Sequence, residues 1–226
     1  LYTVSGEYEG FGGHRGANGI LDSEGSVAAA STILDNTYYS ISTANNRIGQ
    51  VKLTISTTIN TYAEYDLSIN TGAGDIDING ALANLGELNL TSTSAGSEIS
   101  GIISTDTIVN KTGSGTLTLS GTNTYTGDTV ISNGTLTVSS SGTLAATTDV
   151  SVAENAIYDV DSTDTIQSLS GAGDVQLATG VTLTFGDAID YTLSGDISGA
   201  GSIIKQGVGV QILSGNNDYT GDTTIT

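Results

Sequence analysis

Three carboxylates in one short segment are the residues whose type and spacing are best suited to bind a metal ion. Asp159, Asp161 and Asp164 follow one another closely after Tyr158. Alternating carboxylates can converge on calcium, which prefers oxygen ligands. The segment lacks the glycine and the distal glutamate of a helix–loop–helix calcium loop, and Gly-Ala-Gly-Asp at 72–75 and 171–174 only loosely resembles the glycine–aspartate calcium nonapeptide. The sequence suggests no cofactor other than calcium.

The remaining reactive side chains do not form a recognisable catalytic arrangement in the sequence. A hydrolase that acts through carboxylates would need several of them in one cluster, and no such cluster is visible. A lyase would also need basic side chains beside its substrate, whereas Arg15 and Arg47 are far from the repeats described below. His14 is the only histidine, and no serine or cysteine lies near it in a recognisable nucleophile motif. We therefore predict that the chain is not an enzyme, with a sugar-cleaving enzyme as the third-ranked class.

Two tyrosines occupy equivalent positions, Tyr125 before Thr-Gly-Asp and Tyr219 before the same tripeptide. A repeated tyrosine of this kind is expected to pack a corner of the fold with its ring and to leave its hydroxyl in water. Stacking against a sugar is the alternative role. In either role the two tyrosines would belong to a structural element that repeats along the chain.

That element is a segment that occurs twice. Lys111–Thr129 returns as Lys205–Thr223 without insertion or deletion. A finer repeat of an apolar residue, Ser and Gly begins at Ile99, Leu119, Leu193 and Leu213, with 20 residues between the members of each pair. Such a step suits one turn of a β-solenoid and is too short for a helix-turn-helix repeat of about 33 residues. The chain is therefore predicted to be a solenoid whose turns bury their apolar faces against one another.

Composition and charge further limit the fold class and the possible partners. The 226 residues include 31 Gly but no Pro, Cys, Met or Trp, which favours short strands joined by sharp turns. The net charge of −19 with only five basic residues argues against nucleic acid and anionic lipid as partners. We interpret the acidic surface mainly as a soluble coat. The absence of Cys fits an exported chain.

Strands and corners can be placed locally. Thr116–Leu119, Thr135–Val138, Thr182–Phe185 and Asp75–Ile78 alternate polar and apolar residues, which predicts strands with one buried face. The corners are expected where Gly, Asn and Ser cluster, at 71–74, 132–134, 170–173 and 198–201. Stacked Asn and Ser at such corners can bond along the axis without forming a binding site.

The repeated segment, with Ser132-Asn-Gly-Thr-Leu136 after its first copy, resembles the autotransporter-associated β-strand repeat of bacterial type V secreted proteins. The resemblance covers 99–138 and 193–226, the second copy being truncated, with weaker echoes at 67–80 and 166–186. It implies an all-β, right-handed parallel β-helix in 61–226. Residues 1–60 are expected to form irregular N-terminal turns or a cap. No secretion signal or membrane-barrel strands are recognisable, so we expect a fragment of a longer chain.

Structural roles are assigned to the repeated positions of the motif. In the two copies these are Lys111, Gly113, Gly115, Leu117, Leu119, Gly121, Tyr125 and Gly127, and Lys205, Gly207, Gly209, Leu213, Gly215, Tyr219 and Gly221.

The function implied by the resemblance is adhesion or self-association on the bacterial surface. The chain is expected to be extracellular, either anchored at the outer membrane or secreted, and to associate with copies of itself or with host or matrix glycans through an extended polar face. It is not expected to bind nucleic acid or to insert into a membrane. The alternative is a structural subunit of a filament or surface layer that assembles by end-to-end stacking of solenoids.

Overall fold

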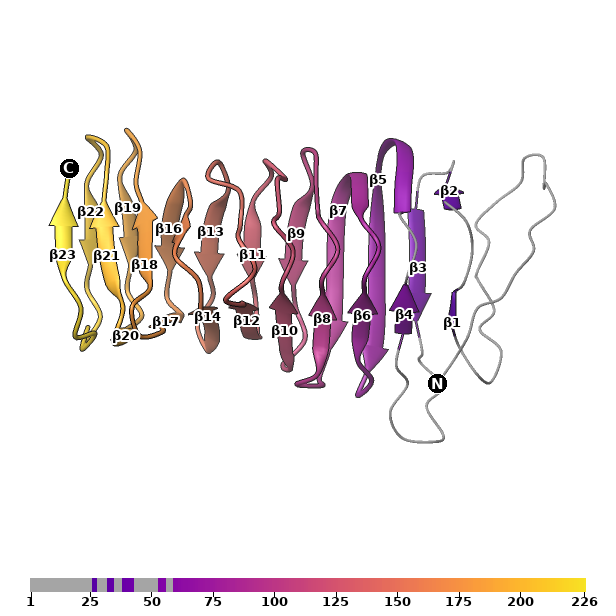
Figure 1. Cartoon of the computed structure of the whole chain (residues 1–226), viewed down its shortest axis with the longest axis horizontal. Helices are drawn as coiled ribbons and strands as arrows, with labels where there is room; N and C mark the ends of the chain where they lie inside the picture. Colours follow the sequence, from indigo (N-terminus) through magenta and orange to yellow (C-terminus); the bar gives the residue numbers. More distant parts are fainter. Residues whose placement is uncertain (1–25, 28–31, 35–37, 43–52, 56–58) are drawn as a thin grey trace.

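The computed structural model describes residues 26–27, 32–34, 38–42, 53–55 and 59–226. In this part of the chain the strands are parallel and stack as a β-solenoid of about 8 turns with a spacing near 20 residues (Figure 1). The predicted fold class and turn length are confirmed. The described residues contain no helix long and apolar enough to cross a membrane.

Two long sheets form the walls of the solenoid. The nine-stranded sheet is ordered β1 (Ser26–Val27), β4 (Leu53–Ile55), β6 (Ile76–Ile78), β8 (Ser97–Ile99), β10 (Thr116–Leu119), β12 (Gly134–Val138), β14 (Ala156–Val160), β17 (Asp174–Leu177) and β20 (Ile197–Gly199). The ten-stranded sheet is ordered β2 (Thr32–Leu34), β5 (Ile59–Gly72), β7 (Leu82–Ser92), β9 (Ile108–Lys111), β11 (Thr129–Ile131), β13 (Asp149–Val152), β16 (Ser168–Gly171), β19 (Tyr191–Leu193) and β22 (Gln211–Leu213), and β3 (Tyr38–Ser42) also pairs with β5.

A third wall becomes a sheet only in the later turns. The four-stranded sheet is ordered β15 (Asp164–Thr165), β18 (Thr182–Phe185), β21 (Ser202–Lys205) and β23 (Thr223–Ile225). In earlier turns isolated parallel bridges occur instead, between Leu82 and Ile103 and between Thr122 and Thr143. The cross-section therefore has two long sides throughout and a third that lengthens toward the C-terminal end.

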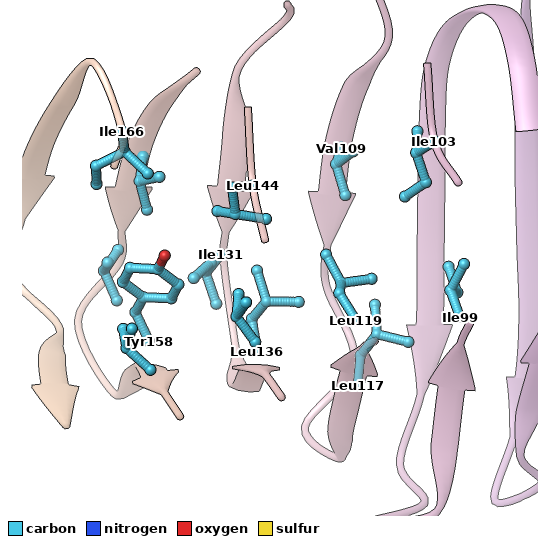
Figure 2. Close-up of a cluster of buried hydrophobic side chains, with 14 of the residues drawn as sticks. Ile99, Ile103, Val109, Leu117, Leu119, Ile131, Leu136, Leu144, Tyr158 and Ile166 are labelled. Carbon is cyan, nitrogen blue, oxygen red and sulfur yellow. The ribbon is translucent and has the colours of Figure 1, made fainter. Parts of the chain in front are cut away.

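Alternation of side chains builds the core. Leu117 and Leu119 of β10 pair in register with Leu136 and Val138 of β12, and all four are buried. Their polar neighbours point outward, as expected for a strand with one wet face. The apolar side chains thus stack along the axis into one continuous core, part of which Figure 2 shows from Ile99 to Ile166.

The corners use glycines as predicted. Gly134 follows Asn133 with φ of 67°, a left-handed conformation that glycine adopts without strain. Gly72, Gly171 and Gly199, in three other predicted corners, also have positive φ.

The predicted division at residue 60 stays a prediction. Strand β5 runs across it, and β1 to β4 pair within the same two long sheets. His14, Arg15 and Arg47 lie outside the described residues.

Candidate functional site

The three candidate calcium ligands lie on different sides of the wall. Asp159 points outward from β14, where Thr137 donates to its carboxylate at 3.2 Å, and Asp161 is exposed just after the strand. Asp164 is buried. Burial, with the nearby Asp161, raises the pKa of Asp159. Within the described residues no group of three or more His, Cys, Asp or Glu side chains is placed to hold a metal ion.

Asp164 occupies a place that asparagine fills elsewhere in the solenoid. Its Oδ2 accepts from the backbone N–H of Leu144 at 2.8 Å, 20 residues earlier. Asn123 Oδ1 accepts in the same way from Ile103 at 2.9 Å, and Asn217 Oδ1 from Ile197 at 2.8 Å. Each side chain therefore fastens its own turn to the preceding one.

The two asparagine side chains also donate a hydrogen bond, which an ionised carboxylate cannot do. Asn123 Nδ2 donates to the Gly121 carbonyl at 3.0 Å, and Asn217 Nδ2 donates to the Gly215 carbonyl at 3.1 Å. An ionised carboxylate has no proton to donate. Burial raises the pKa of Asp164 from 3.8 to about 6, although the N–H groups of Leu144 and Thr165 oppose that rise. The protonated acid is the form that resembles asparagine.

Tyr125 is buried, and the expectation that its hydroxyl would face water is wrong. The hydroxyl lies 2.6 Å from Thr129 Oγ1, which lies 3.1 Å from Thr148 Oγ1 in the next turn. Thr148 Oγ1 donates to the Gly127 carbonyl at 2.7 Å. Burial raises the pKa of Tyr125 above 10. The second repeat copy keeps the contact between tyrosine and threonine, with the Tyr219 hydroxyl 2.5 Å from Thr223 Oγ1.

A second buried tyrosine, which sequence reasoning did not single out, lacks this support. Tyr158 lies among the aliphatic side chains of the core (Figure 2), and its hydroxyl oxygen has no hydrogen-bond partner. Burial raises its pKa well above 10. The inward position of residue 158 in an alternating strand was the signal that could have identified it.

The two tyrosines make a matched pair for mutation. We expect Tyr158→Phe to leave the free energy of unfolding unchanged or to raise it by about 1 kcal/mol, because it removes an unsatisfied buried hydroxyl. Tyr125→Phe should lower it by about 1 to 2 kcal/mol, because Thr129 loses a partner. Urea denaturation followed by circular dichroism measures both. A larger loss for Tyr158→Phe than for Tyr125→Phe would contradict this assignment.

The repeated lysines are structural in the described turns. Lys111 is buried, and its Nζ donates to the carbonyl of Gly113 in its own corner and to that of Asn133, in the next turn, at 2.9 Å. Burial lowers the pKa of Lys111 to about 8. Lys205 Nζ donates to the carbonyls of Gln206 and Gly207. Neither amine in residues 59–226 is therefore presented to a partner.

The repeated glycines and leucines mostly lie where successive turns of the solenoid pack against one another. Leu117 and Leu119 are buried, Leu213 is half-buried against the core, and Gly113, Gly115 and Gly121 are buried where turns approach closely. At Gly127, Gly207, Gly209, Gly215 and Gly221 an added Cβ would also lie within 2.5 Å of a backbone atom of the preceding turn. These positions act in stacking rather than in binding a ligand.

Comparison with known proteins agrees with this picture. The model of the passenger-associated-transport-repeat family matches residues 109–138 and 203–226, within the two predicted copies. Over 117 residues, 51% of this chain, the sequence is 42% identical to a Brucella suis biovar 1 (strain 1330) protein named adhesin BmaC autotransporter. The aligned part is 3% of that protein's length. No solved structure matches the chain. The stacked parallel strands and both sequence matches support an autotransporter passenger domain in which the model of this repeat matches twice.

Proposed function

We propose that this chain is part of an adhesive rod displayed on or secreted from a bacterial surface, where it makes many weak contacts and catalyses no reaction. The observation that carries the proposal is a ladder of uncharged polar side chains on the outer face of the ten-stranded sheet. A parallel stack repeats such groups at the spacing of neighbouring strands, about 4.8 Å. Contacts that are individually weak then add through multivalency.

The ladder is clearest on β7 and β9. Asn110 Nδ2 donates to Asn89 Oδ1 at 2.8 Å, and the hydroxyls of Thr91 and Thr112 lie 2.7 Å apart. Register continues the Asn89 column through Val130 and Ser151 to Ser170. The side chains hold one another in place along the axis, so less conformational entropy is lost when they bind.

The Glu87 carboxylate lies beside the ladder, where it accepts from Asn89 Nδ2 at 3.3 Å and from Asn110 Nδ2 at 3.5 Å, but the ladder itself is uncharged. The nine-stranded sheet is different. There a column of residues in register carries Asp77, Glu98 and Asp159, interrupted by two threonines. Residues 59–226 contain 19 acidic residues and two lysines, and both lysines direct their amines to backbone carbonyls. Two copies that met through the acidic face would repel each other. The uncharged ladder therefore fits a second copy, or a neutral glycan, better than the acidic column does.

Beads coated with the purified chain test the proposal. We expect them to clump, or to bind glycan-coated surfaces, and we expect Asn110→Glu to reduce binding several-fold because it places a charge in the ladder. Gln176→Glu, which adds the same charge on the outer face of β17, is the matched control. Equal effects of the two variants would rule out the ladder as the contact face.

Light scattering and electron microscopy separate the remaining possibilities. A mass independent of concentration, together with no clumping and no glycan binding, would remove the adhesive role. Long fibres joined end to end would favour the filament alternative.

A further inference from the structure

An exposed apolar patch lies on the outer wall near the second repeat copy. In the part of the chain that the structure describes, Val208, Val210 and Ile212 are 90%, 56% and 52% exposed, and Ile189 on the preceding turn is 59% exposed. The two turns are in register here, because Gln211 pairs with Tyr191 and the Tyr191 N–H donates to the Val210 carbonyl at 2.8 Å. We call Ile189, Val208, Val210 and Ile212 the apolar patch.

The first repeat copy shows that the repeat itself does not require this patch. The positions equivalent to Val208, Val210 and Ile212 are Ser114, Thr116 and Thr118. Three hydroxyl side chains in one copy are thus three aliphatic side chains in the other. These three differences lie at outward positions, so they change the surface of the repeat rather than its core.

The second copy also exchanges polar and apolar residue types in part of its strand, although the inward and outward positions stay the same. Leu117 of the first copy points into the core, and its equivalent is Gln211, whose Oε1 is buried without a partner and whose Nε2 donates to the Leu169 carbonyl at 3.1 Å. A shift of one residue would bury Val210 and Ile212 and expose the glutamine. The repeat register instead keeps Leu213 and Tyr219 against the core. Departures from the polar–apolar pattern of this kind are typical of functional surfaces.

The patch does not depend on the second copy lying in the last described turn. In the first copy, where turns stack on both sides, Ser114 is exposed and Thr116 and Thr118 are half-buried. Their outward direction keeps them on the surface of a complete stack. Val210 and Ile212 alternate in the same way with the inward Gln211 and Leu213, so they too point outward from a side wall.

We infer that the apolar patch is a docking site for a protein segment that carries apolar side chains next to lysine or arginine. Asp187 and Asp190 border the patch, and each holds its place by accepting from a neighbouring backbone N–H, that of Ile189 at 2.7 Å and that of Val210 at 2.7 Å. A basic, apolar segment matches both the charge and the aliphatic surface. A second copy of residues 59–226 matches less well, because it presents no free lysine amine. This site goes beyond the proposed adhesion, which uses the uncharged ladder.

A short peptide of alternating leucine and lysine is the probe, and peptides of alternating serine and lysine or leucine and glutamate are its controls. The test variant, Val208→Ser with Val210→Thr and Ile212→Thr, gives the second copy the residues of the first at these three positions and keeps the charge. We expect the leucine–lysine peptide to bind the wild-type chain about tenfold more tightly than this variant. Ile102→Thr, at an exposed position between β8 and the bridge at Ile103, should leave affinity unchanged.

Three results would overturn the inference. Equal affinity of the wild type and the triple variant, or of the serine–lysine peptide, would show that only the overall negative charge binds. Association of the chain with itself that the triple variant abolishes would assign the patch to a second copy. Marked destabilisation of the triple variant in urea would show that these side chains are buried. Because Asn110→Glu does not touch the patch, failure of the adhesive role and failure of this site can be told apart.

Discussion

Replacing Gly115 by alanine is expected to lower the free energy of unfolding by about 3 kcal/mol or more. A Cβ built on Gly115 would lie 1.9 Å from the Ser94 carbonyl oxygen, a backbone atom of the preceding turn. The same turns are joined by the bond from the Gly115 N–H to the Ser92 carbonyl at 3.0 Å. Backbone cannot move aside as a side chain can, so the two turns must separate. A fall in the urea midpoint measures the loss.

Gly180→Ala is the control for this effect. Gly180 has φ of 78° but open space around its Cβ position, so alanine there meets only the strain of the left-handed conformation, about 1 kcal/mol. Similar losses for the two variants would mean that close stacking at Gly115 contributes nothing beyond ordinary backbone effects.

Replacing Asp164 by asparagine is expected to stabilise the chain near pH 7.5. The pKa of Asp164 is about 6 in the folded chain against 3.8 for an ordinary aspartate. Between pH 3.8 and 6 the Asp164 carboxyl is protonated in the folded chain and ionised in the unfolded chain. The contribution of this carboxyl to folding stability is therefore complete below about pH 4 and is lost as the pH rises through 6. With allowance for solvent screening, the difference is about 2 kcal/mol.

Comparing the free energies of unfolding at two pH values isolates the effect of the Asp164 carboxylate. Asp164→Asn should exceed the wild type by about 2 kcal/mol near pH 7.5 and match it near pH 4, where the acid is already protonated. Asp128→Asn, which removes an exposed charge from the first repeat, is the control for the loss of one negative charge. If Asp164→Asn is instead less stable near pH 7.5 in the presence of calcium, the carboxylate binds the ion, as the predicted calcium site requires.

Most of the fold could be predicted because its information is local. Alternation in Thr116–Leu119 predicts which side chains face inward, and Asn133 and Gly134 mark a corner without reference to the rest of the chain. The return of Lys111–Thr129 as Lys205–Thr223 without insertion or deletion predicts stacked turns. These features depend on side-chain period and on the conformational freedom of glycine, both of which a sequence displays directly.

The candidate sites were less predictable because neighbouring turns determine them. Sequence spacing grouped Asp164 with Asp159 and Asp161, but the bond to Leu144 from the preceding turn places Asp164 inside. Tyr125 was expected to reach water, but Thr129 lies against its hydroxyl and Thr148 of the next turn continues the network. Partners about 20 residues away decide how deep a polar group lies, and no local pattern reports them.

The sequence by itself determined that this protein is a stack of parallel turns, where its strands and corners lie, and which repeat family it resembles. Only the tertiary structure decided which wall each copy occupies: Leu117 lies on β10 of the nine-stranded sheet, whereas the equivalent Gln211 lies on β22 of the ten-stranded sheet. The physical reason is that Lys111 and Lys205 are 94 residues apart, which is not a whole number of turns of about 20 residues, so the second copy falls on a different wall from the first. On that wall Leu213 and Tyr219 pack against the core, and alternation along the strand leaves Val210 and Ile212 at the surface.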